Sequence, residues 1–516
     1  MVKQNIKIMT CIIMTFIASL AVAEDMSLDS WMLLHDNIQD SSLQLETSLK
    51  PTEQGNQSPQ LNQESVDLSQ IEKPVRVLID VRSDHSDGAH DFKTLVGLAK
   101  ARHIQALAFT EHDRYSIRFG LDPVPHIFGY SQEHPSLYET GLEKFFSDLN
   151  TIQKQSDLTL FSGTESTPGY YWQGIPFKNL SLHEAERHII TLGAKTPEQV
   201  EGLTSYDLRH GYGNKELSLM FWCLFIFSFI FILFRKRKRG IALLLAGSFI
   251  AFITTWLMKA DINPDEDFIN SAHEQGLIAI WTHPGTLSGA RDGPMGVFLN
   301  TPPYNEVVFQ SSKADAFAAV YGDTDKNTIP SGLWDQYMMD YMAGYRPKPI
   351  WAVAAGDYHE EGHANEYLGN FPMDVWAKSA QEDDILLALK KGRMVAWHMR
   401  KQQNIAVKAL YMDYTDPTSG AKERLLAGGE AAVTKDVRVV VALRELGSPQ
   451  EFHNLKGQWI VDGKVVAHVS LSTDESIPVF ASTLNLPIGR HVIRFQIPAQ
   501  QGIRLEANPF LVQVRK

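Results

Sequence analysis

Cysteine is nearly absent from this chain, which has only two in 516 residues. Cys11 and Cys223 both lie in strongly apolar segments, so the polar parts of the chain have no thiol for a disulfide or a cysteine-based zinc site. A metal ion bound in those parts would need histidine, aspartate or glutamate as ligands. An excess of positive charge is also lacking, since the formal net charge is −12. Without a basic face, we expect no nucleic-acid partner.

The length of the chain exceeds what one ordinary hydrophobic core supports, so we expect two folded domains plus additional segments. Residues 1–23 have the layout of a secretory signal peptide, with two lysines, an apolar run and then small residues. An uncleaved anchor helix is the alternative, and either one exports the chain that follows. Residues 24–74 are rich in glutamine, serine and asparagine and are expected to form a polar linker.

Two uncharged apolar segments, Leu217 to Phe234 and Ile241 to Met258, predict a transmembrane hairpin at residues 216–259. Five consecutive cations, Arg235 to Arg239, lie between them, and the positive-inside rule places these in the cytoplasm. Two buried core helices are the alternative, but a core hairpin would not carry five cations at its tip. We therefore expect a protein of the inner (cytoplasmic) membrane whose folded domains lie on the periplasmic side.

The stretch from Val75 to Arg114 predicts a strand, a polar loop, a helix, a second strand and a second polar loop. Strands separated by a helix of this length indicate a βαβ unit and a parallel sheet. In such sheets the loops that follow the strands meet at one site. The same reasoning predicts further helices at 137–155, 265–274, 314–321, 334–345 and 383–391, and further strands at 157–161, 187–192, 276–281, 306–309 and 349–355.

The predicted hairpin interrupts a single α/β domain, because the alternation of strands and helices resumes after it. The first part of this domain is 75–215 and the second part is 260–398. From 399 to 516 the pattern changes to short alternating segments, which predict a small β-sandwich of immunoglobulin-like shape. Asp462-Gly463 predicts a tight hairpin turn within it.

Potential metal ligands gather on or just after successive predicted strands. A single histidine in such a place is more often structural, but eight ligand types at corresponding places favour a metal site. Imidazole and carboxylate without thiolate suit zinc, manganese or iron in a site that keeps positions open for water. The candidate ligands are Asp80, Asp87, His112, Glu165, His188, His283, Asp357 and His359, and Arg82 lies among them.

Five motifs in chain order resemble the PHP family, named for polymerase and histidinol phosphatase. They are Ser86-Asp87-Gly88, Thr110-Glu111-His112-Asp113, Gly163-Thr164-Glu165, His283-Pro284 and Gly356-Asp357-Tyr358-His359. The resemblance covers roughly 75–396 apart from the hairpin. A helix ending in Lys391-Gly392-Arg393 before a β-rich tail is similar to the CehA/McbA-like branch of metal-dependent phosphoesterases.

The resemblance implies a distorted (β/α)7 barrel with up to three divalent metal ions at the carboxyl ends of its strands. It also implies which residues share an ion, with Glu165 bridging two of them. The implied groups are Glu165 with His188 and His283, Asp87 with His112 and His359, and Asp80 with Asp357 in the remaining site.

The chain departs from the family pattern where a His-x-His pair aligns with Asp80 and Arg82. A guanidinium stays protonated and offers no lone pair to a metal. Arg82 either replaces part of a missing ion's charge and clamps a phosphate oxygen, or it pairs with Asp80 or Asp84 and marks a decayed site. We expect two metal ions, with a third only if the altered site still binds one.

The activity that the resemblance implies is hydrolysis of a phosphate ester. Two divalent ions would activate a water molecule, and His359 or a ligand-free histidine such as His363 would protonate the leaving group. The expected substrate is a phosphorylated or other small-molecule ester, because some members of the resembled branch cleave other esters. The alternative, motivated by Arg82, is a catalytically degenerate scaffold that acts as a binding or assembly module in the cell envelope.

Overall fold

The structure is a computed structural model, and its elements belong to one compact unit of the chain, 56–362 with 366–516. It describes residues 73–120, 129–174, 178–206, 238–243, 245–247, 263–285, 289–293, 296–321, 325–363, 367–400, 404–447, 453–474 and 480–516. The predicted signal segment, nearly all of the linker and most of the predicted hairpin lie outside these residues. Within the described ranges, no helix is both long enough and apolar enough to cross a membrane.

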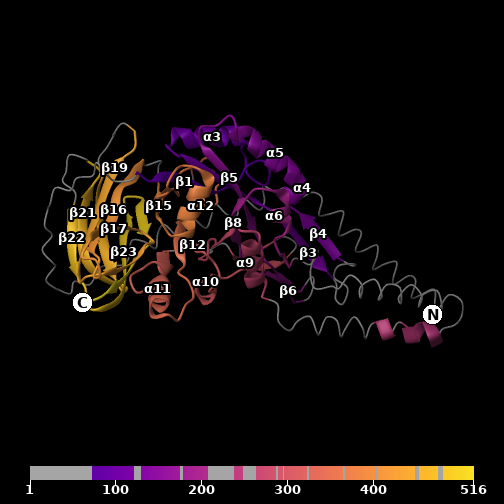
Figure 1. The fold of residues 1–516 in the computed structure, drawn as a ribbon. Helices are drawn as coiled ribbons and strands as arrows, with labels where there is room; N and C mark the ends of the chain where they lie inside the picture. The colour runs from indigo at the N-terminus through magenta and orange to yellow at the C-terminus, as the bar shows by residue number, and fades with distance from the viewer. Residues whose placement is uncertain are drawn as a thin grey trace. The chain divides into compact units, whose positions relative to one another are not determined.

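Nine strands of a larger mixed sheet form the α/β part of the molecule, in the order β13-β12-β9-β8-β5-β2-β1-β14-β15 (Figure 1). Seven of them (β1, β2, β5, β9, β12, β13 and β15) run in the same direction. The other two run in the opposite direction, since β8 is antiparallel to both β5 and β9, and β14 is antiparallel to both β1 and β15. The carboxyl ends of seven strands and the amino end of β8 therefore lie at one edge. The nine strands are β1 (Val75–Val81), β2 (Ala106–His112), β5 (Thr159–Ser166), β8 (Ile189–Ala194), β9 (Ile278–Trp281), β12 (Ala316–Val320), β13 (Trp351–Ala354), β14 (Met373–Val375) and β15 (Met394–Met399).

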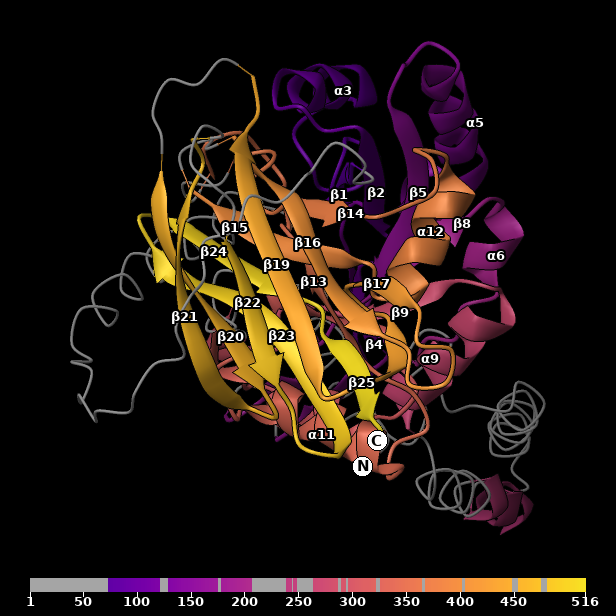
Figure 2. The same cartoon turned by 60° about the vertical axis from the view of Figure 1, so that its left-hand side comes forward.

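Helices cover the outside of these strands, with α3, α5 and α12 near β1, β5 and β8 (Figures 1 and 2). Helix α3 begins at Asp91, whose carboxylate accepts a hydrogen bond of 2.8 Å from the backbone N–H of Thr94. The predicted helix at 137–155 is broken at Gly141, which has a φ of 100°. The helices are α3 (Phe92–Ala101), α4 (Leu137–Thr140), α5 (Leu142–Gln153), α6 (Pro197–Glu201), α9 (Pro264–Glu274), α10 (Asn305–Gln310), α11 (Leu333–Ala343) and α12 (Glu382–Lys390).

Two predicted elements are wrong. Residues 306–309, predicted as a strand, lie in helix α10, and residues 314–321, predicted as a helix, contain strand β12. The valines and phenylalanine of the first segment favour a strand locally, and the alanines of the second favour a helix. Packing overrides both preferences, because β12 is buried along its whole length between β9 and β13, where small side chains fit on both faces.

Two sheets pack face to face in the C-terminal part, as Figure 2 shows. One sheet has the order β17-β16-β19-β22, and strands β20, β21, β23, β24 and β25 belong to the other. Alternate residues of β19, from Val437 to Leu443, contribute to the hydrophobic core between the sheets. The predicted turn at Asp462-Gly463 joins β20 to β21, and both of its residues have positive φ. The immunoglobulin-like shape stays a prediction.

The C-terminal strands largely confirm the predicted segments and extend them. They are β16 (Ile405–Thr415), β17 (Lys422–Leu426), β18 (Glu430–Val433), β19 (Asp436–Glu445), β20 (Asn454–Val461), β21 (Lys464–Ser472), β22 (Phe480–Asn485), β23 (Gly489–Gln500), β24 (Ile503–Ala507) and β25 (Phe510–Val514). Because β15 pairs with β24, one continuous sheet joins the α/β part to the C-terminal part. Smaller sheets, which the sequence did not predict, are formed by β3 (Ser116–Gly120) with β4 (Gly129–Glu133), and by β6 (Tyr171–Gln173), β7 (Ser181–His183), β10 (Ala290–Asp292) and β11 (Phe298–Asn300).

Candidate metal centre

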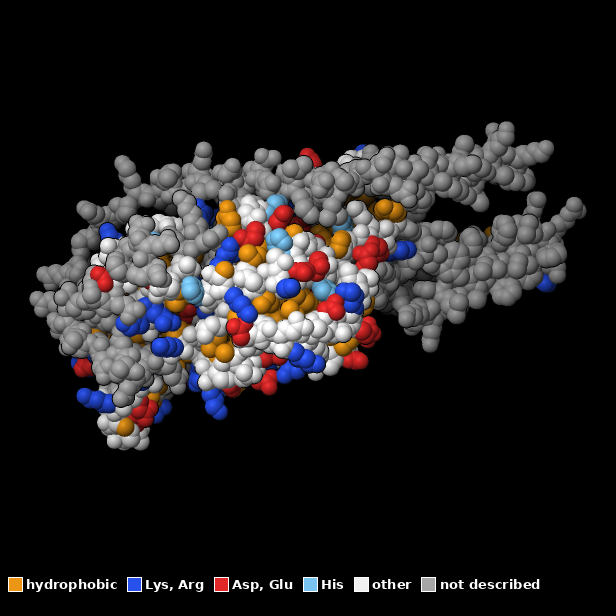
Figure 3. Space-filling view, turned by 90° about the horizontal axis from the view of Figure 1, so that it is seen from above, with side chains coloured by type: hydrophobic (Ala, Val, Ile, Leu, Met, Phe, Trp, Pro, Cys, Tyr) orange, Lys and Arg blue, Asp and Glu red, His pale blue; other side chains and the backbone are white. Residues whose placement is uncertain are grey.

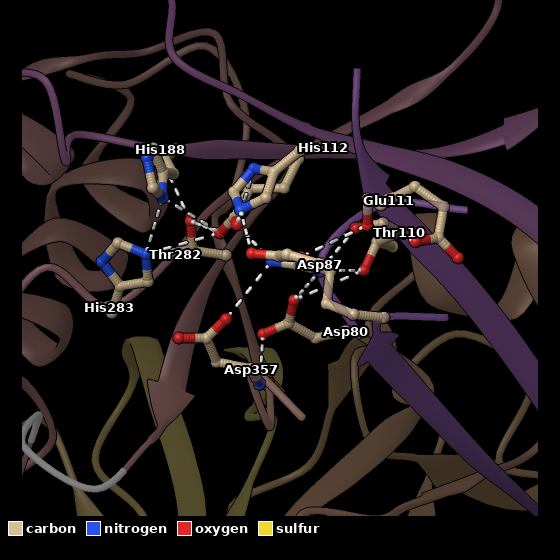
Figure 4. A network of polar contacts seen from close by, with 12 residues as sticks. Asp80, Asp87, Thr110, Glu111, His112, His188, Thr282, His283 and Asp357 are labelled. Carbon is tan, nitrogen blue, oxygen red and sulfur yellow. Dashed lines mark hydrogen bonds and ion pairs between the residues drawn. The ribbon is translucent and has the colours of Figure 1, made fainter. Parts of the chain in front are cut away.

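All eight candidate ligands lie at the edge of the sheet where the parallel strands end. The antiparallel direction of β8 explains the position of His188, which directly precedes that strand. Figure 4 shows the imidazoles of His112, His188 and His283 and the carboxylates of Asp80, Asp87 and Asp357 facing one another. The positions are Asp80 in β1, Asp87 in the following loop, His112 at the end of β2, Glu165 in β5, His188 before β8, His283 after β9, and Asp357 and His359 after β13.

The eight side chains form three groups whose potential ligand atoms lie within 4.8 Å of one another in each group. Glu165 belongs to two of the groups, as the resemblance implies, so its carboxylate lies between them. The three groups are Asp87 with His112 and His359, Glu165 with His188 and His283, and Asp80 with Glu165 and Asp357. Whether these residues bind metal ions stays a prediction.

The group around Glu165 is buried. Glu165 Oε1 lies 3.4 Å from both His188 Nδ1 and His283 Nε2, and these two nitrogen atoms are 3.1 Å apart. Burial opposes the charge of Glu165, but Arg82 and the imidazoles outweigh it and hold the pKa of this carboxyl well below its usual range. The carboxylate is therefore ionised at neutral pH, as a metal ligand must be.

The group around Asp87 is more open. Asp87 Oδ2 lies 3.4 Å from His112 Nε2 and 3.3 Å from His359 Nε2. Nδ1 of His359 lies 2.7 Å from the backbone carbonyl oxygen of Asp357, so the proton at Nδ1 leaves Nε2 available as a ligand. Burial opposes the charge of His359, but Asp87 and Asp357 raise its pKa to about 10. Metal binding at this group would therefore release a proton.

Both groups fit a divalent ion, because each combines two imidazoles with one carboxylate. The Arg82 guanidinium contacts Glu165 only at Oε2 and leaves Oε1 to His188 and His283. This donor set suits zinc, manganese or iron. The side chain of His359 is 31% exposed, whereas those of His188 and His283 are 11% and 9% exposed. Solvent or a substrate therefore reaches the centre most directly at the Asp87 group.

Arg82 occupies the third group. Its Nη1 donates to Asp80 Oδ1 at 3.0 Å and to Thr110 Oγ1 at 2.8 Å, and also to the Thr110 carbonyl oxygen. Its Nη2 donates to Glu165 Oε2, and to Asp357 Oδ1 at 3.3 Å. The guanidinium is completely buried. Of the alternatives left open by the sequence, pairing with Asp80 is the one observed. Both Nη atoms are engaged, and Nε, which has no partner among the described residues, is buried, so the guanidinium has no exposed donor for a substrate phosphate.

The backbone is strained at three of the candidate ligands. Asp80, His283 and Asp357 have φ angles of 68°, 25° and 47°, which non-glycine residues seldom adopt. Asp80 and Asp357 lie in adjacent chain segments joined by two hydrogen bonds, from Tyr358 N to the Asp80 carbonyl at 3.0 Å and from Arg82 N to the Tyr358 carbonyl at 2.9 Å. Such strain persists where the surrounding structure enforces it, and it concentrates at functional sites.

A buried glutamate that the sequence did not single out holds the loop that carries Asp87. Glu111 accepts hydrogen bonds from the backbone N–H of Ser83 at 3.0 Å and from the hydroxyl of Ser83 at 2.6 Å. Its other oxygen accepts from the Ser86 hydroxyl. The sequence could have indicated this role. Glu111 directly precedes the candidate ligand His112 in a strand, and neighbouring residues of a strand point to opposite sides, so Glu111 is expected to point away from the ligands.

Further contacts around the centre were also missed. Thr282 donates to Glu165 Oε1 at 3.3 Å and to the carbonyl of His188 at 3.0 Å. The ring of Tyr115 lies 4.5 Å from that of His112. Neither residue stands out in the sequence, because a threonine or tyrosine beside a histidine is commonplace.

The aromatic residues at 170–172 lie near the Glu165 strand, where Tyr170 is buried and Tyr171 is exposed. The Tyr170 hydroxyl accepts from Arg118 N at 2.8 Å, and Trp172 Nε1 donates to the Arg118 carbonyl at 2.7 Å. Tyr171 stacks on His183 with the ring centroids 4.7 Å apart. On the face seen in Figure 3, histidine, acidic and hydrophobic side chains lie close together on the described surface.

Comparison with solved structures finds partial similarity to three proteins of interest. A two-domain protein from Bacteroides vulgatus, containing a predicted PHP-like metal-dependent phosphoesterase, is 12% identical over 89% of this chain and 100% of that chain, with a TM-score of 0.34. A proposed metal-dependent phosphoesterase from Bifidobacterium adolescentis is 12% identical over 62% of this chain and 97% of that chain, with a TM-score of 0.28. An amidohydrolase from Chromobacterium violaceum, with bound sulfate and no metal, is 14% identical over 56% of this chain and 89% of that chain, with a TM-score of 0.25.

No model of a known protein family matches the sequence, and no curated protein matches it. The function proposed below therefore rests on the geometry of the site and on the sequence motifs.

Proposed function

We propose that this protein is a metal-dependent hydrolase, and that its reaction is the hydrolysis of a phosphate ester. The observation that carries the proposal is the pair of ligand groups around Glu165 and Asp87, each with two imidazoles and one carboxylate. When bound there, two divalent ions would lower the pKa of a water molecule and neutralise charge on the phosphoryl group. The ligands of this proposal are six of the eight residues predicted from the sequence, namely Asp87, His112, His359, Glu165, His188 and His283. Asp80 and Asp357, which Arg82 engages in the third group, are left out.

The chain's own residues support a shared centre rather than two separate sites. Glu165 Oε1 faces His188 and His283, and Glu165 Oε2 lies 3.7 Å from His112 Nδ1 of the other group. One carboxylate thus contacts both groups, so ions held by them would act on the same substrate. Thr282 fixes the orientation of this carboxylate through its hydrogen bond to Oε1.

His359 was expected either to bind a metal ion or to protonate the leaving group, and it cannot do both through Nε2. In this proposal its Nε2 is a ligand of the Asp87 group, so it has no proton there to donate. The role of general acid is therefore assigned to a ligand-free histidine, for which the sequence offers His363.

The remaining parts of the proposal come from the sequence. The distorted (β/α)7 barrel and the CehA/McbA-like branch are supported by the five ordered motifs. Tethering to the inner membrane, with the catalytic and β-rich parts on the periplasmic side, is supported by the export signal at 1–23 and by the apolar segments around Arg235 to Arg239. A small phosphorylated or other ester is the proposed substrate.

Metal analysis and an aryl phosphate assay test the proposal. The purified full-length protein should retain divalent ions after dialysis and should hydrolyse a generic aryl phosphate with zinc, manganese or iron. His112→Ala should abolish turnover, because it removes a ligand of the Asp87 group. The control His468→Ala changes an exposed histidine of β21 and should retain full activity. Absence of both bound metal and turnover with all three metals would leave the degenerate envelope scaffold as the better account.

A further inference from the structure

The third group of potential ligands differs from the other two because a cationic side chain already lies among its oxygens. Asp80, Glu165 and Asp357 bring three carboxylates together. The two terminal nitrogens of Arg82 donate to all three of them. An ion bound by this group would have to occupy the space that the guanidinium fills.

The hydrogen bonds of Arg82 fix it in this place. The two Nη nitrogens carry four hydrogens and face five acceptor atoms. Nη1 donates to Asp80 Oδ1 and to two oxygens of Thr110, and Nη2 donates to Glu165 Oε2 and Asp357 Oδ1. Thr110 contributes both its hydroxyl and its carbonyl oxygen, so the side chain is held from the β2 side as well. No Nη hydrogen is left to bind a substrate phosphate, and the guanidinium has no solvent-exposed surface.

The charges of the third group also favour a guanidinium in this place rather than a metal ion. Three carboxylates buried together repel one another and need a cation close by. Burial opposes the charge of Arg82, but Glu165, Asp80 and Asp357 raise its pKa above the ordinary value of arginine. Unlike a bound metal ion, this cation cannot dissociate, be chelated or lose its proton.

We propose that Arg82 is a permanent cation that takes the place of a third metal ion, so that the centre binds two ions and no more. In this role Arg82 is a positioning residue. It holds Glu165 Oε2 and Asp357 while leaving Glu165 Oε1 to the His188 and His283 group. The inference rests on the proposed metal centre, and it removes the phosphate clamp from the roles considered for Arg82.

The stoichiometry of bound metal tests the inference without any assay of activity. The full-length protein is loaded with zinc or manganese, dialysed, and analysed by plasma mass spectrometry. The wild-type chain should retain two ions. Arg82→Lys, which keeps a positive charge, should also retain two. Arg82→His removes the permanent charge and supplies a ligand, so it should retain three.

A second readout applies if a variant folds poorly. Because Arg82→His leaves three carboxylates without their cation, its melting temperature should fall well below that of the wild type in a chelator and recover in excess metal, more than for Arg82→Lys. Three ions on the wild-type chain, or two on Arg82→His with no metal-dependent recovery, would overturn the role of Arg82 alone. No bound ion on any variant would overturn both this inference and the proposed metal centre.

Discussion

The loop that carries Asp87 depends on the absence of a single side chain. Gly88 lies so close to the backbone of Arg82 that a Cβ at this position would be 2.5 Å from its carbonyl carbon and oxygen. The loop closes there because Gly88 N and Ser86 N both donate to the Ser83 carbonyl, at 3.0 and 3.1 Å. The glycine of the Ser-Asp-Gly motif therefore serves to bring Asp87 near His112.

We predict that Gly88→Ala weakens metal binding and lowers the free energy of unfolding by about 1–3 kcal/mol, because the loop must move away from Arg82. Urea denaturation and a metal titration measure the two effects. The control is Gly97→Ala, in the exposed middle of α3, where a Cβ meets no atom within 4 Å. This control should stabilise the chain by roughly 0.5–1 kcal/mol. Unchanged metal affinity and stability in Gly88→Ala would contradict the close approach described above.

At the residue scale, the sequence located the candidate ligands but not their partners. The ligands were found because chemically suitable residues follow successive strands, which is a local pattern. For Arg82 the sequence offered only the nearby Asp80 and Asp84 as partners, and it missed Glu165 and Asp357, which are 83 and 275 residues away along the chain. Only the packed structure brings these three side chains together.

At the scale of elements, one buried carboxylate links four strands. Asp374 of β14 accepts hydrogen bonds from Trp397 Nε1 of β15 and from Val407 N of β16, both at 2.8 Å. Arg76 of β1 donates to its other oxygen at 3.4 Å. Because Asp374 is only 1% exposed, none of these donors has water as a substitute partner.

Asp374→Ala should lower the free energy of unfolding by roughly 3–5 kcal/mol, because it leaves the buried charge of Arg76 unpaired. The matched control is Asp383→Ala, whose carboxylate is 81% exposed and pairs with Lys195 at the surface. That control should cost less than about 1 kcal/mol. Equal losses for the two variants in urea denaturation would show that Asp374 does not join the strands as described.

The sequence predicted the type of an element correctly where an amphipathic pattern extended over several turns, as in α3. The prediction failed for short apolar runs. Residues 306–309 and 314–321 were assigned the wrong type because a run of this length fits a buried strand and a buried helix turn equally well. The type of the second run depends on β9 and β13, between which β12 lies. The small sheets were missed because their three- to five-residue strands carry almost no periodic signal.

At the scale of the whole molecule, the C-terminal part is packed into the α/β part, and one of its side chains bridges two strands there. Asn508 lies between β13 and β15, where its Nδ2 donates to the carbonyls of Ala352 at 2.9 Å and Met394 at 3.2 Å. Its Oδ1 accepts from Ala352 N at 2.8 Å. The Asn508 side chain thus joins the backbones of β13 and β15 by hydrogen bonds, in the place of direct backbone pairing between these two strands.

The two parts are also joined by buried charges. Arg494 of β23 donates to both oxygens of Asp335 in α11, at 2.6 and 2.9 Å. The same guanidinium donates to Glu506 of β24 at 3.3 Å. The β-rich tail therefore shares a sheet with the strands that carry the candidate ligands and an ion-pair network with helix α11.

Asn508→Ala is expected to lower the free energy of unfolding by at least about 2 kcal/mol, since the N–H and the carbonyl of Ala352 lose this partner at about 1–3 kcal/mol each. The Met394 carbonyl keeps the backbone N–H of residue 508 as a donor. Asn485→Ala, at an exposed position of β22 that pairs with Asp436, should change stability by about 0.5 kcal/mol or less. Thermal and urea unfolding of both variants measure the difference. If Asn508→Ala loses no more stability than Asn485→Ala, the Asn508 side chain does not join β13 to β15 as described.

The most direct test of the central claim is anomalous X-ray diffraction from crystals of the metal-loaded protein, recorded above and below the absorption edge of zinc or manganese. We predict two anomalous peaks, one beside Asp87, His112 and His359 and one beside Glu165, His188 and His283, with the Arg82 guanidinium between Asp80 and Asp357. No peak at either group, or a peak among Asp80, Glu165 and Asp357 with Arg82 displaced, would contradict the account.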